Sequence, residues 1–309
     1  MKHIRFKKSF WVLLSVVAII VVGFVGIKTY LSYIHSNKYL LREKGYTEEQ
    51  IEKIKDDEKL IKILLEREYN EDLLTITKEK YFLEKNLDKY LDYKKKNPKR
   101  SLTDVVAIVN VGADKDWYKD AKKTDTSKGI LMLINKFNGL DEEFEVEELV
   151  DMSVMYAFNG KKIDKRVYDD FKSMANAAKG QGLKIVANST YRSYNDQVKT
   201  YNSIKGSKGL EYADKVAARP GHSEHETGLA IDISTLKNEG DFEDTEEFKW
   251  LQEHAHEYGF ILRYPKDKEY ITGYAYESWH YRYVGIDVAV KIKKENITFD
   301  EYYAYYVEG

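Results

Sequence analysis

One short pattern of residues constrains this 309-residue chain more than any other feature. It begins with Ser-Glu-His-Glu-Thr-Gly-Leu-Ala-Ile-Asp at residues 223–232 and continues with Glu-Ser-Trp-His at residues 277–280. The pattern supplies two imidazoles, one carboxylate ligand and one further carboxylate. A catalytic zinc site needs such a set, because three protein ligands leave one position open for water and a nearby base takes the proton of that water.

The first half of the pattern predicts a β-strand over residues 228–234. Side chains of a strand alternate between its two faces, and one face here is apolar, with Leu229, Ile231 and Ile233. The other face carries Asp232 between small residues. A carboxylate in that setting fits a metal ligand better than a packed side chain. Gly228 permits the turn that would bring His225 back to the same ion.

The second half predicts another strand, over residues 279–284. On it His280 faces away from Trp279, so we expect His280 to reach the metal while Trp279 packs. Glu277 lies three residues earlier and is expected to lean over the metal without binding it. His225, Asp232 and His280 then give two nitrogen ligands and one oxygen ligand, a set that suits zinc.

Composition narrows the choice of ligands and partners. The chain contains no cysteine, so His, Asp or Glu must hold any metal. Its formal net charge is only -2, and a nucleic-acid partner would require a basic surface. We therefore predict a zinc ion as cofactor and no nucleic-acid partner.

The N-terminal residues predict a membrane anchor. A basic flank that includes Lys2, Arg5, Lys7 and Lys8 precedes an uncharged run from Phe10 to Ile27. As a helix this run would be about 27 Å long, close to the hydrocarbon thickness of a bilayer. We expect a cytoplasmic tail at 1–9, a transmembrane helix at 10–33 and an extracytoplasmic remainder. A cleaved signal peptide is the alternative, although its apolar region is normally shorter.

Residues 34–100 are rich in charged residues, and their apolar residues recur at helical spacing. The sequence Thr-Glu-Glu-Gln at 47–50 is typical of a capping box that opens a helix. We interpret the segment as a charged helical stalk or small module. A solvated helical hairpin packed on the later domain is the alternative that the sequence leaves open.

Residues 101–309 predict one further domain. We expect strands at 105–111, 131–134, 184–190, 228–234 and 279–284, and helices at 164–178, 193–204 and 244–258. Strands and helices do not alternate regularly, which favours an α+β fold with an antiparallel core over a parallel sheet.

The pattern resembles the VanY-type D-alanyl-D-alanine carboxypeptidases, zinc peptidases related to the D-alanyl-D-alanine dipeptidases, lysostaphin and the hedgehog domain. Ser223-x-His225-x6-Asp232 and Glu277-x-Trp279-His280 carry the resemblance. Tyr191-Arg192-Ser193 followed by Gln197 is similar to an upstream motif of that family. The resemblance extends over about two thirds of the chain, from residue 101 onward.

The resemblance implies a fold and a role for each residue of the motifs. The fold would be a small antiparallel sheet with packed helices. His225, Asp232 and His280 would bind zinc, and Glu277 would be the catalytic base. Arg192 would bind the substrate carbonyl and the oxyanion formed from it. The other expected substrate contacts are Ser223, near the terminal carboxylate, Gln197, more as a support than a reacting group, and Tyr191.

The resemblance also implies a function. We expect a membrane-anchored zinc carboxypeptidase that removes the C-terminal D-alanine from peptidoglycan stem peptides at the outer face of the cytoplasmic membrane. An L,D-carboxypeptidase that acts on tetrapeptide stems is the nearest alternative. A non-catalytic, zinc-containing wall-binding module is the alternative from another class.

Overall fold

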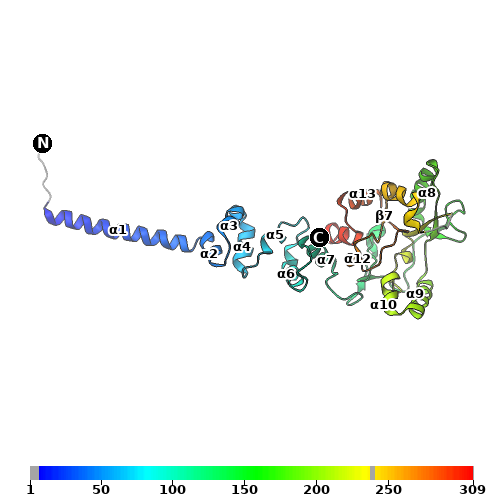
Figure 1. The fold of residues 1–309 in the computed structure, drawn as a ribbon, viewed down its shortest axis with the longest axis horizontal. Coiled ribbons are helices and arrows are strands. Elements are labelled where there is room, and N and C mark those ends of the chain that lie inside the picture. Colours follow the sequence, from blue (N-terminus) through cyan, green and yellow to red (C-terminus); the bar gives the residue numbers. More distant parts are fainter. Residues whose placement is uncertain (1–6, 237–240, 309) are drawn as a thin grey trace. The chain divides into compact units, whose positions relative to one another are not determined.

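The computed structural model describes residues 7–236 and 241–308, and the chain divides into two compact units, residues 1–84 and 85–309. The first unit is helical (Figure 1). Its helices are α1 (Lys8–Ile34), α2 (Asn37–Glu43), α3 (Glu48–Ile54), α4 (Glu58–Glu66) and α5 (Leu73–Ile76).

Helix α1 is the one helix of the described residues that is long and apolar enough to cross a membrane. The candidate span, Phe10–Tyr33, has 24 residues and contains an 18-residue window with a mean hydropathy of 2.8, of which nothing is buried. A signal sequence near an N-terminus has the same properties. Lys2 and Arg5 of the basic flank lie outside the described residues.

The remaining helices of the first unit form a small module with its own core. The predicted capping box is present at the start of α3, where Gln50 N donates to Thr47 Oγ1 over 3.2 Å and Thr47 N donates to Gln50 Oε1 over 2.8 Å. Buried apolar side chains join the helices, among them Leu41, Ile51, Ile54, Leu60 and Leu64. The helix that was predicted to begin at this capping box is therefore confirmed.

The second unit mixes helices and short strands. Its α-helices are α6 (Leu87–Lys96), α7 (Leu102–Val111), α8 (Lys165–Gly180), α9 (Tyr194–Lys208), α10 (Leu210–Val216), α11 (Glu246–His254), α12 (Glu269–Thr272), α13 (Ile286–Glu295) and α14 (Phe299–Tyr306). Its strands are β1 (Lys122–Lys123), β2 (Asn138–Gly139), β3 (Leu149–Asp151), β4 (Lys162–Asp164), β5 (Ile185–Ser189), β6 (Ala230–Thr235), β7 (Phe260–Leu262) and β8 (His280–Tyr283). The 3₁₀ helices are η1 (Glu84–Asn86), η2 (Thr126–Leu131), η3 (Glu224–Thr227), η4 (Phe242–Asp244) and η5 (Ala255–Tyr258).

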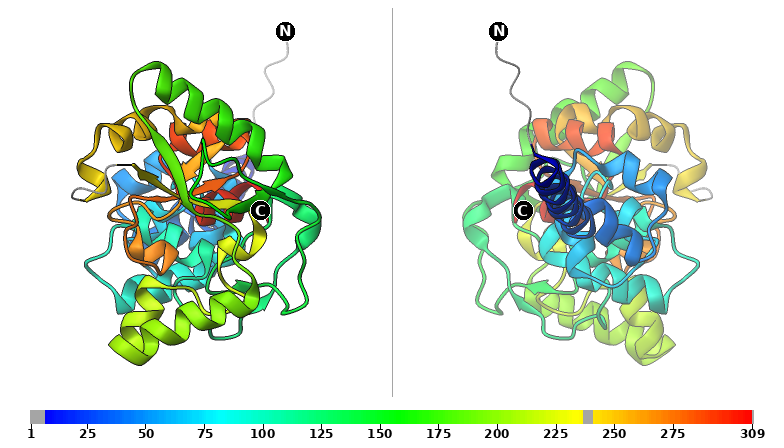
Figure 2. Two further views of the ribbon diagram at one scale, coloured as in Figure 1. Left: turned by 90° about the vertical axis from the view of Figure 1, so that its right-hand side faces the viewer. Right: turned by 90° about the vertical axis from the view of Figure 1, so that its left-hand side faces the viewer.

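A four-stranded antiparallel sheet with the order β5-β6-β8-β7 is the centre of this unit. One face packs against α8 and α11 in a core that includes Phe171, Ile231 and Phe260. The hairpin of α9 and α10 lies on the opposite side of the sheet from α8 (Figures 1 and 2). The predicted α+β fold is confirmed, and β5, β6 and β8 are the strands predicted at 184–190, 228–234 and 279–284.

Two predicted strands are wrong. Residues 105–111 belong to helix α7, which Ser101 caps by accepting from Asp104 N and which Gly112 ends in the left-handed conformation. The valines and isoleucine of α7 are buried, and this burial outweighs the preference of β-branched residues for strands. Residues 131–134 form no strand because side chains take their carbonyl groups: Arg282 donates to Met132 O, and Thr124 donates to Leu133 O.

Gly259 gives a stability prediction for this fold. It ends η5 with φ of 82°, and an added Cβ would lie 2.7 Å from the Tyr283 ring and 3.1 Å from the Gly285 backbone. Gly259→Ala is therefore expected to lower the free energy of unfolding by at least about 2 kcal/mol, through strain and overpacking. Gly206→Ala is the control, because an added Cβ within α9 meets nothing within 4 Å. Urea unfolding checks the prediction. The free energy of unfolding should be well below that of the wild type in Gly259→Ala, and equal to or above it in Gly206→Ala.

Candidate active site

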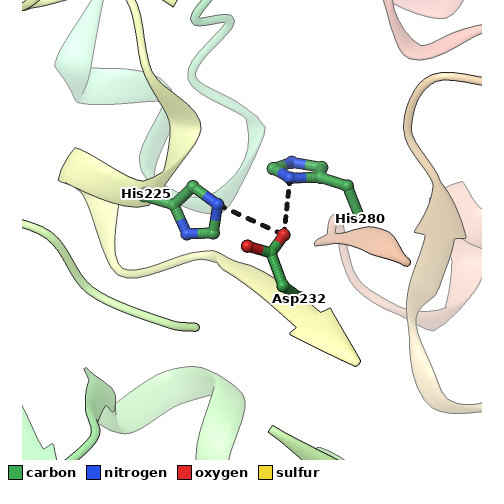
Figure 3. Close-up of side chains that lie close together, drawn as sticks. All are labelled: His225, Asp232 and His280. Carbon is green, nitrogen blue, oxygen red and sulfur yellow. Dashed lines mark hydrogen bonds and ion pairs between the residues drawn. The ribbon is translucent and has the colours of Figure 1, made fainter. Parts of the chain in front are cut away.

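Three of the predicted residues converge on the face of the sheet opposite α8. His225 lies in η3, Asp232 in β6 and His280 at the start of β8, and all three point toward one another (Figure 3). Asp232 Oδ1 is 3.3 Å from His225 Nε2 and 3.1 Å from His280 Nδ1. One ligand atom from each residue lies within 4.8 Å of the others. The three side chains can therefore contact one ion.

Local structure explains how residues distant in the sequence meet. Asp232 and His280 are directly opposite in the antiparallel pair β6–β8, so their side chains are cross-strand neighbours. His225 is brought back to them by the turn at Gly228, which is left-handed with φ of 68°. A Cβ at Gly228 would lie 3.0 Å from Asp164 N, so the position also requires the absence of a side chain.

Each imidazole is oriented by a hydrogen bond on the side away from the ligand cluster. His225 Nδ1 is 2.7 Å from the carbonyl oxygen of Thr190, which leaves Nε2 directed at Asp232. His280 is turned the other way: Nε2 is 3.3 Å from Glu224 Oε2, and Nδ1 faces Asp232. A partner of this kind fixes which ring nitrogen keeps its hydrogen and which offers a lone pair.

The electrostatics of the cluster fit a cation. Burial disfavours charge on Asp232, but His225 and His280 outweigh burial and hold the pKa of that carboxyl below its ordinary value. Burial would lower the pKa of His280, yet hydrogen bonds to Asp232 and Glu224 raise it to about 9. A cation would displace that proton. Two imidazole nitrogens and one carboxylate form a donor set that zinc accepts in catalytic sites, so the residues fit zinc.

Glu277 lies beside the cluster without belonging to it. Its Oε2 is 3.7 Å from His280 Nδ1, and its side chain is mostly buried. Burial raises the pKa of Glu277 to about 7, and the negative charge of Asp232 acts in the same direction. A carboxyl group with a pKa near neutrality can accept a proton and return it during one reaction.

Arg192 is held in place by two side chains. Its Nη1 donates to Gln197 Oε1 over 2.7 Å, and its Nη2 donates to Ser189 Oγ over 3.1 Å. Gln197 is buried and its amide also donates to Ala218 O over 2.6 Å. Both ends of the Gln197 amide are thus engaged by the protein, which supports a positioning role for it.

A cavity of about 180 Å³ connects these groups. Among the residues predicted to contact substrate, Arg192, Gln197 and Ser223 line it, whereas Tyr191 does not. Tyr191 as a substrate contact stays a prediction. The remaining wall comes from Thr200 and Ile204 of α9, from residues 216–218 at the end of α10, and from Glu224, Tyr264, Tyr274 and Trp279.

The expectation that Trp279 packs into the core is wrong. The indole is 43% exposed and lines the cavity. Strand β8 begins only at His280, so the alternation of faces does not extend to Trp279.

Glu224 was not predicted as a functional residue, and it is fully buried between Arg263 and Arg282. A signal for it was present, because the alternation of side chains along a strand over 279–284 puts Arg282 on the same face as His280. An arginine buried on that face requires a carboxylate partner.

The resemblance implies that Arg192 donates to a developing oxyanion, and on that role replacing it with alanine is expected to lower kcat about 10²–10³-fold, because one electrostatic donor is lost. Zinc content should stay at the level of the wild type, since Arg192 contacts none of the three ligands through its side chain. Lys199→Ala is the control, because Lys199 is an exposed residue of the same helix as Gln197. Steady-state kinetics distinguishes a role in the transition state from a role in substrate binding. A rise in KM alone, with kcat unchanged, would assign Arg192 to ground-state binding.

Known proteins are similar to this chain in the region that contains these motifs. The family model described as VanY: D-alanyl-D-alanine carboxypeptidase matches residues 160–286. The chain is 40% identical to YodJ of Bacillus subtilis over 204 residues, which cover 62% of this chain and 75% of that protein.

Two solved structures are also similar. The first is the LdcB LD-carboxypeptidase, with 39% identity, a TM-score of 0.57 and coverage of 60% of this chain and 91% of that chain. The second is the vancomycin-resistance D,D-pentapeptidase VanY in complex with Zn(II), with 34% identity, a TM-score of 0.50 and coverage of 56% and 97%. The residues matched by the family model, 160–286, include the candidate site.

Proposed function

This chain belongs to the VanY family of D-alanyl-D-alanine carboxypeptidases and is a peptidase, and we propose that it is a zinc enzyme that removes the C-terminal D-alanine from peptidoglycan stem peptides. The observation that carries the proposal is the convergence of His225, Asp232 and His280, with Glu277 and Arg192 in one cavity. Family membership leaves the non-catalytic wall-binding module without support.

The residues around the cluster have separable tasks in amide hydrolysis. A zinc ion held by His225, Asp232 and His280 would lower the pKa of a water molecule to about 7 and polarise the substrate carbonyl. Glu277 accepts a proton from the attacking water and returns it to the amine of the leaving D-alanine, while a C–O bond forms and the C–N bond breaks. Arg192 donates to the oxyanion that develops on the carbonyl oxygen. Gln197 and Ser189 keep the guanidinium group in place for that step.

The substrate would enter with its carboxyl end first. Ser223 is nearly buried and lines the cavity, and we place its hydroxyl group near the terminal carboxylate of the substrate. Trp279 lies partly exposed on the cavity wall, where it would contact the preceding residues of the stem peptide.

We further propose that α1 anchors the enzyme in the cytoplasmic membrane, with the second unit outside the cell. The support is the apolar run Phe10–Tyr33, which follows Lys7 and Lys8. Intact mass measurement of the chain recovered from the membrane fraction tests this. Retention of α1 supports the anchor, and a chain shortened by its removal would identify a signal peptide.

Digestion of purified muropeptides by the full chain in detergent tests the bond that is cut. We expect release of D-alanine from pentapeptide stems. The similarity to LdcB, described as an LD-carboxypeptidase, favours a second candidate that would act on tetrapeptide stems. Mass spectrometry distinguishes them: conversion of pentapeptide to tetrapeptide supports the D,D-activity, and conversion of tetrapeptide to tripeptide with intact pentapeptide would replace it with the L,D-activity.

A further inference from the structure

The strongest unassigned feature near the cavity is a buried cluster of four charged side chains. It consists of two carboxylates, Glu224 and Asp300, and two guanidinium groups, Arg263 and Arg282, and each of the four side chains is at most 2% exposed. Their formal charges cancel. Buried charges are costly unless they are paired and hydrogen-bonded, so such a cluster requires a reason.

Glu224 is the member that connects the cluster to the ligands. Its Oε1 accepts from Arg263 Nε over 2.7 Å and from Arg282 Nη1 over 2.8 Å. Its other oxygen, Oε2, is 3.3 Å from His280 Nε2. One oxygen is thus held by both arginines, and the other is directed at a ring that belongs to the candidate zinc site.

The arginines are themselves fixed. Arg263 donates to Asp300 Oδ2 over 2.6 Å, and Asp300 accepts in turn from Asn135 over 2.8 Å. Arg282 donates to the carbonyl groups of Ile130 and Met132 over 2.8 and 2.9 Å. Turning Glu224 away from His280 would therefore disturb its charge-assisted hydrogen bonds to both arginines.

We propose that Glu224 is a positioning residue, which sets the tautomer and the direction of His280. With the hydrogen kept on Nε2 by Glu224, the lone pair of Nδ1 is free to bind the ion beside Asp232. His225 needs no carboxylate partner, because the carbonyl oxygen of Thr190 lies against its Nδ1 and keeps the hydrogen on that nitrogen. The inference rests on the proposed zinc enzyme, and it adds that the affinity for zinc depends on a residue outside the ligand set.

Two variants with the same change in charge test this. Glu224→Gln and Asp300→Asn each remove one negative charge from the same cluster, but only Glu224 contacts His280. Both are expected to lower the melting temperature of the apoprotein. Only Glu224→Gln is expected to weaken zinc binding, measured by competition with a fluorescent chelator, by about 10–100-fold. Equal weakening in both variants, or unchanged affinity in Glu224→Gln, would overturn the inference.

A measurement on the wild-type protein keeps the test valid if Glu224→Gln does not fold. In the zinc-loaded chain labelled with ¹⁵N at histidine, Nε2 of His280 should carry a hydrogen that exchanges slowly with water, and Nδ1 should be the nitrogen bound to zinc. Zinc on Nε2 would contradict the inference. Failure of the wild type to bind zinc at all would instead refute the proposed function, so the two failures are distinguishable.

Discussion

Glu277→Gln is expected to retain zinc and to lower kcat on a stem pentapeptide by about 10²–10⁴-fold, the usual contribution of a positioned general base. The amide has nearly the same shape as the carboxylate but cannot accept the proton of the attacking water. Glu277 lies 3.7 Å from His280 Nδ1 and is not one of the three ligands, so the metal should stay in place.

Elemental analysis of the purified variant, together with D-alanine release, checks both parts of this prediction. Glu253→Gln is the control, because Glu253 is an exposed carboxylate of the same unit, and this variant should behave as the wild type. Unchanged turnover in Glu277→Gln would remove Glu277 from its role as base. Loss of zinc would instead make it a ligand.

Asp232→Ala is expected to remove zinc and activity together, and its loss of turnover should exceed that of Glu277→Gln. Asp232 is the only carboxylate among the three ligands and lies between both imidazoles. Without the ion, the chain loses both the activation of water and the polarisation of the carbonyl group. Zinc added after chelation should restore the wild type and leave Asp232→Ala inactive.

The matched control for Asp232→Ala is Ser234→Ala. Ser234 is the next residue on the same face of β6, and its hydroxyl group bonds to Thr235 O rather than to the cluster. This variant should keep stoichiometric zinc and full turnover. Retention of zinc and turnover by Asp232→Ala would show that the ion is held elsewhere.

The ligand cluster could be anticipated from the sequence because its geometry is local. Alternation along β6 places Asp232 on the face without bulky side chains, and the short stretch through Gly228 brings His225 to it. The observed antiparallel pairing of β6 with β8 then sets Asp232 opposite His280. A period of two and a turn residue indicate which side chains face the site, and the strand pairing brings them together.

The features that the sequence did not reveal depend on contacts between distant segments. Helix α7 has the β-branched composition of a strand, and its burial within the unit, together with the caps at Ser101 and Gly112, favours a helix. The role of Glu224 depends on Arg263 and Arg282, which are 39 and 58 residues away. The part of the cavity wall supplied by α9 and by the end of α10 is set by how that hairpin packs, and no local pattern specifies it.

Diffraction from crystals of the zinc-loaded chain, recorded on both sides of the zinc absorption edge, tests the central claim most directly. One anomalous peak is expected in contact with His225 Nε2, His280 Nδ1 and a carboxylate oxygen of Asp232, at about 2.0–2.2 Å from each. A zinc peak at another place, or none at these three residues in crystals that contain zinc, would contradict the account.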